Sequence, residues 1–286
     1  SAATRRDRLQ RVIDLLVKHN EAFCQAMGED FGGRPAVFSM MNDVAGSLGS
    51  LKHARDHLEA WMPDQARPSV APFDNFGATA WVKYQPKGVV GIIGTWNAPL
   101  FTLLSPLASV FAAGNRAVLK PSEIAPRTAE LLARVVPEFF QPEELAVVTG
   151  GPEVAAEFSQ QAWNHLVFTG STRVGKLIMK AAAENLVPVT LELGGKSPVL
   201  IGSGADIANA AERIAVGKSA NSGQLCVSPD VVWVHESEAD NLLQAIQSIY
   251  KGLFPTTADN QDVTPTKRYT PWKLKRKNSP LLCQTC

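Results

Sequence analysis

Two side chains in the sequence have the types expected of a nucleophile and its base. Cys226 follows Gly-Gln-Leu in a stretch with no apolar run that would bury it. The thiolate is the reactive form of cysteine, so such a residue needs an electropositive setting or a nearby base. Glu192 stands inside the apolar run Val189–Leu193, where partial burial would make its carboxylate a better base. Strand alternation is the alternative, with Thr190 and Glu192 both facing water.

Trp96 and Asn97 follow the apolar run Val89–Ile93. The Asn97 amide could donate a hydrogen bond to an oxyanion. Alternatively, Asn97 is the N-cap of a helix that begins near Pro99, which is a common arrangement. These residues alone leave both interpretations open.

Lys120, Ser122 and Glu123 follow the apolar run Ala117–Leu119. The Lys120 ammonium and the Glu123 carboxylate could bind the hydroxyls of a ribose, and Glu123 would repel a 2′-phosphate. The competing interpretation is a surface ion pair, worth about 0–1 kcal/mol.

A glycine-rich cluster follows the run Leu166–Phe168 and precedes a predicted helix. Exposed N–H groups at such a turn suit a phosphate, although the spacing is not G-x-G-x-x-G and glycines also occur there for steric reasons. The residues of this cluster are Thr169, Gly170, Ser171, Thr172, Arg173, Val174 and Gly175.

Three other patterns carry less chemistry. His53 and His57 are spaced i, i+4 but lack the Glu of the zinc-protease motif, and no metal site is expected. Cys283 and Cys286 have redox or zinc spacing without a second pair, so chance explains them better. Cys24 lies on the apolar side of the first helix and is expected to be a core residue.

The elements that must position these clusters alternate along the chain. Apolar, β-branched runs separated by helical stretches indicate an α/β fold with an open parallel sheet, Rossmann-like, whose ligands bind beyond the carboxyl ends of the strands. The predicted strands of this sheet are Val89–Ile93, Ala117–Leu119, Ala146–Val148, Leu166–Phe168, Val189–Leu193 and Val199–Ile201. The intervening helices are Leu100–Ala113, Thr128–Phe139, Glu153–Gln160 and Val174–Glu184.

Flanking elements complete the prediction. The periodicity predicts amphipathic helices from about Leu9 to Met27 and from Met41 to Trp61, followed by an exposed strand at Ala78–Tyr84. Downstream lie a helix at Ala208–Ala220, a strand at Val231–Val234 and a helix at Ala239–Tyr250.

Bulk composition excludes several classes of function. A net charge of +1 argues against a nucleic-acid surface, and no apolar run reaches the length of a membrane segment. The start of the chain has no signal peptide, and four scattered cysteines do not form a disulfide framework, so a cytoplasmic location is expected. The chain lacks an initiator Met and is expected to be a fragment.

The clusters, taken together and in this order, resemble motifs of the aldehyde dehydrogenase superfamily. The matching segments are Gly94-Thr95-Trp96-Asn97, Lys120-Pro121-Ser122-Glu123, Phe168-Thr169-Gly170-Ser171, Leu191–Pro198 and Gly223–Cys226. The likeness runs from about Arg5 to about Val263. Cys226-Val227-Ser228-Pro229-Asp230 resembles the branch of shorter enzymes acting on fatty or aromatic aldehydes, including coniferyl aldehyde dehydrogenases.

This resemblance implies the oxidation of an aldehyde to a carboxylic acid with NAD, or with NADP. Cys226 would attack the aldehyde, Asn97 would hold the oxyanion, and Glu192 would activate the water that hydrolyses a thioester. The full-length form would be a homodimer. The cofactor would be held by Trp96, Lys120, Ser122, Glu123, Thr169, Gly170, Ser171, Thr172, Arg173, Val174, Gly175 and Leu193.

The resemblance also predicts a division into domains. Residues 1–193 would form N-terminal helices and the NAD-binding domain, 194–263 the start of an incomplete α/β catalytic domain, and 264–286 an aberrant or disordered tail. Family members continue further, so we expect this chain alone to fold poorly or lack activity. Two alternatives stay open: a CoA-acylating semialdehyde dehydrogenase, and an inactive fragment that at most binds a nucleotide.

Overall fold

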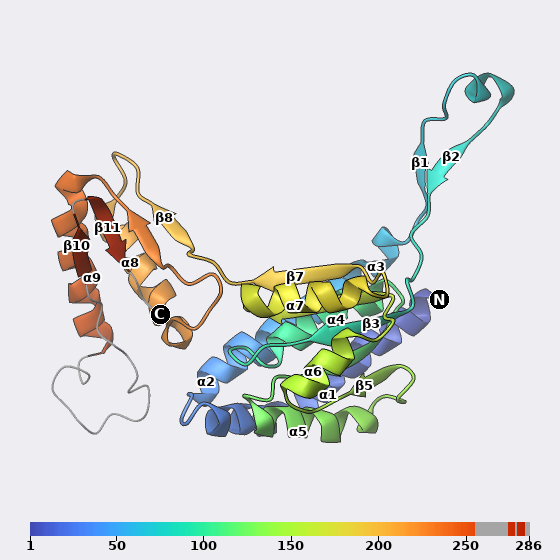
Figure 1. Ribbon diagram of the computed structural model, residues 1–286, viewed down its shortest axis with the longest axis horizontal. Coiled ribbons are helices and arrows are strands. Elements are labelled where there is room, and N and C mark those ends of the chain that lie inside the picture. The colour runs from blue at the N-terminus through green and yellow to red at the C-terminus, as the bar shows by residue number, and fades with distance from the viewer. Residues whose placement is uncertain (255–273, 278, 284–286) are drawn as a thin grey trace. The chain divides into compact units, whose positions relative to one another are not determined.

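The computed structural model describes residues 1–254, 274–277 and 279–283 (Figure 1). The chain forms two compact units, Ser1–Glu192 and Leu193–Cys286, and each is considered by itself. The predicted tail at 264–286 falls mostly outside the described residues, as does Cys286. Within it, β10 (Leu274–Lys277) and β11 (Ser279–Cys283) form an antiparallel pair.

The first unit is built on a five-stranded sheet in the order β5-β4-β3-β6-β7. The pairs β3–β4, β3–β6 and β4–β5 are parallel. The first strand of this sheet therefore lies in the middle, which is the doubly wound order that creates a crevice beside the central strands. The α/β fold with a parallel sheet is confirmed. Its strands are β3 (Val89–Ile93), β4 (Arg116–Lys120), β5 (Leu145–Val147), β6 (His165–Gly170) and β7 (Val189–Leu193).

Helices cover both faces of this sheet, which explains why its central strands are apolar throughout. On one face, Val90 and Ile92 of β3 pack into a large core with the N-terminal helices, α4 and α5. On the other face, a Cβ at Gly91 would lie 2.8 Å from the ring of Phe158 in α6, so only glycine fits there. The connecting helices are α4 (Phe101–Ala112), α5 (Pro126–Val135), α6 (Pro152–Ser159) and α7 (Thr172–Ala183), with the 3-10 turn η3 (Val136–Glu138).

The N-terminal segment adds α1 (Ala2–Asp30), α2 (Ala36–Ser39) and α3 (Gly46–Trp61). The single helix predicted from Met41 to Trp61 is instead interrupted by a π-helical turn, η1 (Met40–Ala45), whose Asp43 is buried. Cys24 is buried in the core, and burial raises the pKa of its thiol, so its interpretation as a core residue is confirmed.

A hairpin of β1 (Gln65–Arg67) and β2 (Ala80–Val82) extends away from the sheet of its unit (Figure 1). Its connection contains the 3-10 turn η2 (Phe73–Phe76). The exposed strand predicted at Ala78–Tyr84 is confirmed with shorter bounds.

The second unit contains a separate parallel pair, β8 (Pro198–Leu200) and β9 (Val231–Trp233). The prediction that Val199–Ile201 belongs to the large sheet is wrong, because these residues pair with β9 instead. A small core of Ala211, Ile214, Val232, Leu242 and Ile246 joins the strands to α8 (Ile207–Ser219) and α9 (Ala239–Leu253). Two 3-10 turns, η4 (Ala220–Gly223) and η5 (Glu236–Glu238), complete the unit.

Candidate functional site

Three predicted clusters lie at one edge of the large sheet. In the register of the strands, Ile93 at the end of β3 pairs with Lys120 of β4 on one side and with Phe168 of β6 on the other. The N–H of Gly94 donates to the carbonyl of Lys120 at 3.1 Å, which extends this alignment into the loops. The segments after β3, β4 and β6 therefore begin at the same level, beside the crevice of the doubly wound sheet.

The loop after β3 carries Trp96 and Asn97, both half-buried. The interpretation of Asn97 as a helix N-cap is wrong, because α4 begins only at Phe101 with Leu100 at the cap position. The cap oxygen comes instead from Asp43, whose Oδ1 accepts the N–H groups of Leu100 at 3.1 Å and Phe101 at 3.2 Å. Asp43, and not Asn97, therefore supplies the side-chain cap of α4.

Asp43 is itself held by a buried arginine. Its Oδ2 accepts from the Arg34 guanidinium at 2.8 Å, and the two side chains are 0% and 3% exposed. The guanidinium carbon lies 4.7 Å from the ring centroid of Phe31, whose ring is in turn 6.2 Å from that of Trp96. Arg34 and Asp43 therefore support the loop at both Trp96 and the start of α4.

The loop after β4 carries Lys120, Ser122 and Glu123. The Lys120 ammonium bonds the Glu123 carboxylate at 3.0 Å. Because the Lys120 side chain is only 1% exposed, the interpretation of this contact as an ordinary surface ion pair is wrong. Burial acts to raise the pKa of Glu123, but a backbone N–H and the Lys120 ammonium outweigh it and lower that pKa. Glu123 is consequently held as an anion whose partly exposed carboxylate can accept further hydrogen bonds.

The loop after β6 leads into α7 through Ser171. The Ser171 hydroxyl accepts the N–H of Val174 at 3.3 Å, and its carbonyl accepts that of Gly175 at 2.8 Å. Ser171, Thr172 and Arg173 are exposed. The first turn of a helix has N–H groups without intrahelical partners, which makes this exposed turn suitable for an anion.

Glu192 lies on β7, the outer strand of the sheet. Along β7 the exposed residues Thr190 and Glu192 alternate with half-buried Val189, Leu191 and Leu193. The expected partial burial of Glu192 is therefore wrong for this chain, and the alternation interpretation holds, because Thr190 and Glu192 share the face of β7 that is exposed in the described residues.

Cys226 lies in the second unit, in an exposed loop that follows α8. The loop begins at Gly223, whose φ of +78° is a left-handed conformation that favours glycine. The Ser197 hydroxyl donates to the carbonyl of Cys226 at 3.0 Å, and the Ser197 carbonyl accepts the N–H of Asp230 at 3.3 Å. Ser197, in the segment that follows Glu192, is thereby bonded to Cys226 itself and to Asp230, which lies after it.

Charged side chains reinforce this connection. Asp230, largely buried, lies 3.2 Å from the Lys196 ammonium and 3.9 Å from that of Lys218. Sequence reasoning missed Ser197, Lys218 and Asp230 as supports of the cysteine loop. A buried lysine in the apolar pattern of α8 was the one signal that could have indicated such an anchor.

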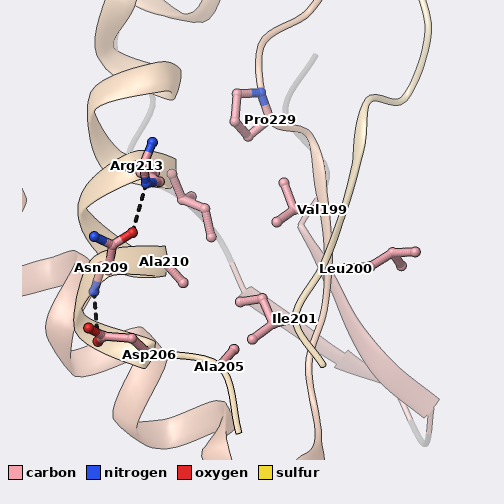
Figure 2. A pocket seen from close by; sticks show the side chains of 10 residues that line it. Val199, Leu200, Ile201, Ala205, Asp206, Asn209, Ala210, Arg213 and Pro229 are labelled. Atoms are coloured by element: carbon pink, nitrogen blue, oxygen red, sulfur yellow. Dashed lines mark hydrogen bonds between the residues drawn. The ribbon is translucent and has the colours of Figure 1, made fainter. Parts of the chain in front are cut away.

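An open groove of about 370 Å³ lies in the second unit, between β8 and α8. Figure 2 shows Val199 and Ile201 pointing toward α8, whereas Leu200 points away from it. The Arg213 guanidinium is engaged with Asn209 at 2.7 Å. The groove is lined by none of the predicted site residues and is separate from the chemistry considered above.

Among the described residues, no group of three or more His, Cys, Asp or Glu side chains could hold a metal ion. In the same part of the chain, no helix has the length and apolarity needed to cross a membrane.

Comparison with known proteins gives a consistent result. The sequence profile of the aldehyde dehydrogenase family matches residues 1–268. The chain is 51% identical over 265 residues to a probable coniferyl aldehyde dehydrogenase of Caulobacter vibrioides, covering 92% of this chain and 55% of that protein. It is 46% identical over 260 residues to a coniferyl aldehyde dehydrogenase of a Pseudomonas strain, covering 91% and 53%.

Solved structures agree with the sequence relatives. The substrate-bound state of Staphylococcus aureus AldH superimposes with a TM-score of 0.84 at 35% identity, over 93% of this chain and 57% of that one. A Mycobacterium tuberculosis aldehyde dehydrogenase complexed with NAD+ gives a TM-score of 0.76 at 30% identity, over 86% and 50%. The chain thus spans about half the length of the relatives it matches.

Proposed function

Because the chain belongs to the aldehyde dehydrogenase family, we propose that it is part of an enzyme that oxidises an aldehyde to a carboxylic acid with NAD, through a thioester on Cys226. The observation that carries this proposal is the bonding of the cysteine loop to the segment that follows Glu192, through Ser197. A nucleophile must be held in position to react, and the bond from Ser197 holds the loop of Cys226.

The first unit fits a dinucleotide at its sheet edge. The N-termini of α4 and α5 are occupied by the carboxylates of Asp43 and Asp30, which would repel a phosphate. The N-terminus of α7 has only the neutral cap of Ser171, so the pyrophosphate would lie there. The Glu123 carboxylate, held by Lys120, would accept hydrogen bonds from the adenosine ribose.

The steps of the reaction assign a task to each catalytic residue. The Cys226 thiolate adds to the aldehyde carbon, and the oxyanion that forms accepts hydrogen bonds from the Asn97 amide and the Cys226 N–H. When bound, the nicotinamide supplies the acceptor for the hydride that leaves the same carbon. The acyl group then remains on Cys226 as a thioester. Glu192 takes a proton from water, the resulting hydroxide displaces the thiolate, and the carboxylic acid is released.

The exposure of Glu192 is compatible with this role. A base that activates water must be reached by water, and its carboxylate faces outward from β7. A CoA-acylating enzyme would not need such a base, since CoA itself removes the acyl group. Glu192 therefore favours hydrolysis over transfer to CoA.

The preferred cofactor and substrate follow from the same features. A carboxylate at the ribose repels a 2′-phosphate, so Glu123 favours NAD over NADP. The coniferyl aldehyde dehydrogenases among the relatives favour an aromatic aldehyde as the substrate.

Two measurements test this proposal. The 286-residue chain should bind NAD in a calorimetric titration, because almost all of the predicted cofactor residues belong to the first unit. A chimera that adds the C-terminal half of the Caulobacter relative should form NADH and acid from coniferyl aldehyde without CoA. Acid formation by the chimera that requires CoA, or no NAD binding by the chimera, would contradict the proposal.

A further inference from the structure

The start of α5 is held by a carboxylate from a distant part of the chain. At its own cap position α5 has Ala125, which has no side-chain oxygen. Asp30, the last residue of α1, accepts hydrogen bonds from the backbone N–H groups of Arg127 at 3.0 Å and Thr128 at 2.9 Å. It also accepts from the Thr128 hydroxyl at 2.7 Å. Asp30 thus replaces the missing N-cap from outside the helix.

The helix start that Asp30 holds is one end of the loop that carries Glu123. The other end is Lys120, which is buried in the sheet at the end of β4. Between these ends the chain makes a tight turn, in which the Ser122 hydroxyl accepts the N–H of Ile124 at 3.3 Å. With both ends fixed, the Glu123 carboxylate is kept 3.0 Å from the Lys120 ammonium.

We infer that Asp30 is a positioning residue for the adenosine ribose: by holding the start of α5, it fixes the loop that presents Glu123 to the ribose hydroxyls. This inference rests on the proposed function of Glu123. Asp30 itself does not contact the nucleotide. Its carboxylate binds the N–H groups at the start of α5, and the position of that helix start determines the geometry of the loop that carries Glu123.

The test measures ribose recognition directly, apart from stability. Adenosine 5′-monophosphate and its 2′-deoxy analogue are titrated calorimetrically into the 286-residue chain, and the ratio of their dissociation constants is compared between variants. A hydrogen bond from the 2′-hydroxyl to a carboxylate makes the unaltered chain prefer AMP by about tenfold. Because both ligands are measured on one preparation, a loss of folded protein changes both titration amplitudes but not the ratio.

Three variants distinguish positioning from a general structural role. Asp30→Ala should reduce the preference to about twofold, and Asp30→Asn should give an intermediate value, because one oxygen acceptor remains. Glu21→Ala, an exposed carboxylate on the same helix, should leave the ratio unchanged.

The outcomes distinguish the role of Asp30 from that of Glu123. A tenfold preference that persists in Asp30→Ala would overturn the positioning role while leaving the ribose role of Glu123 intact. An unaltered chain that binds AMP but shows no preference would overturn the ribose role of Glu123, and the inference with it.

Discussion

The loop of Asn97 and the loop of Cys226 are fixed by different kinds of contact. In the first unit, the end of the loop after β3 donates a hydrogen bond to the Asp43 carboxylate. This carboxylate is 0% exposed and is paired with the buried Arg34 guanidinium. In the second unit, the cysteine loop is bonded by the Ser197 hydroxyl and by Asp230, which lies 3.2 Å from the 67% exposed Lys196 and 3.9 Å from the buried Lys218. Hydrogen bonds to buried charges are stronger than those that compete with water.

This difference assigns different tasks to the two regions. A binding surface for a cofactor must have a fixed geometry, and the first unit supplies one from a large core and buried caps. The region that carries the nucleophile has a small core and leaves its thiol exposed. Among the residues that hold the two loops, Asp43 of the first unit should affect stability more than Ser197 of the second unit. Substitution of Cys226, the reacting group of the second unit, should affect turnover most.

The largest expected effect is that of Cys226→Ser. In the chimera described above, we expect the rate of NADH formation to fall by at least about a thousandfold, because removing a nucleophile disables every later step. NAD binding should persist, since it depends on the first unit. Rates are measured by NADH absorbance and binding by calorimetry, with the buried-site variant Cys24→Ser as the matched control. Turnover that survives Cys226→Ser would assign the nucleophile elsewhere.

The next largest effect concerns the buried pair of the first unit. Asp43→Asn leaves the Arg34 guanidinium buried without its carboxylate, so we expect the free energy of unfolding to fall by about 3–5 kcal/mol. Urea unfolding of the 286-residue chain, followed by circular dichroism, measures this change.

The control for that experiment is Asp56→Asn. This variant breaks the Arg55–Asp56 pair, whose side chains are 26% and 54% exposed, and the free energy of unfolding should change far less than in Asp43→Asn, because water screens an exposed pair. Equal effects of the two substitutions would remove the distinction between buried and exposed anchors.

Local patterns were sufficient to predict most of the fold. The apolar run at Val89–Ile93 matches β3 in full, since a strand buried in a parallel sheet needs continuous apolar residues. The run at Val189–Leu193 matches the bounds of β7, although Thr190 and Glu192 within it are exposed. The helices that connect the strands of the sheet were predicted to within a few residues at each end. The first helix is the poorest match, because it begins at Ala2 and not near Leu9. The placement of three clusters at one sheet edge followed from the rule for parallel strands.

The anchors of the loops could not be predicted in this way. Asp43 caps a helix 57 residues away, and Asp30 caps one 97 residues away, so neither forms a local sequence pattern. Asn97 before Pro99 has the local signature of an N-cap, but the distant Asp43 supplies the cap instead. Tertiary contacts decided these positions, as they decided the exposure of Glu192 on an edge strand.

A medium effect should appear when the first unit is acidified. Hydrogen bonds from Arg11 and then Arg8 on α1 lower the pKa of Glu144, next to β5, from 4.5 to about 2. Since the folded pKa is depressed, this contribution to stability is complete above about pH 4.5 and is lost as the pH falls through about 2. Glu144→Gln should cost about 2 kcal/mol at pH 7 and remove this part of the acid sensitivity.

Urea titrations from pH 7 down to pH 3 measure that dependence. Glu138→Gln, which removes the exposed partner of Lys18, is the matched control and should have a smaller effect. A Glu144→Gln variant with the acid sensitivity of the unaltered chain would show that α1 is not fastened to the sheet through this carboxylate.

The smallest effect should come from Ser197→Ala, which removes the hydroxyl bonded to the Cys226 carbonyl. One such bond contributes about 1 kcal/mol, so the loop should open more often and its backbone amides should exchange with deuterium about fivefold faster. Peptide mass spectrometry of the 286-residue chain follows the exchange of the peptide that contains Cys226, and Ser203→Ala is the exposed control. An unchanged rate would mean that the bond from the Asp230 N–H to the Ser197 carbonyl is enough to hold the loop. The cysteine loop would then be held by a backbone bond, which substitution of a side chain does not remove. In that case the second unit would anchor its loop as firmly as the first unit does.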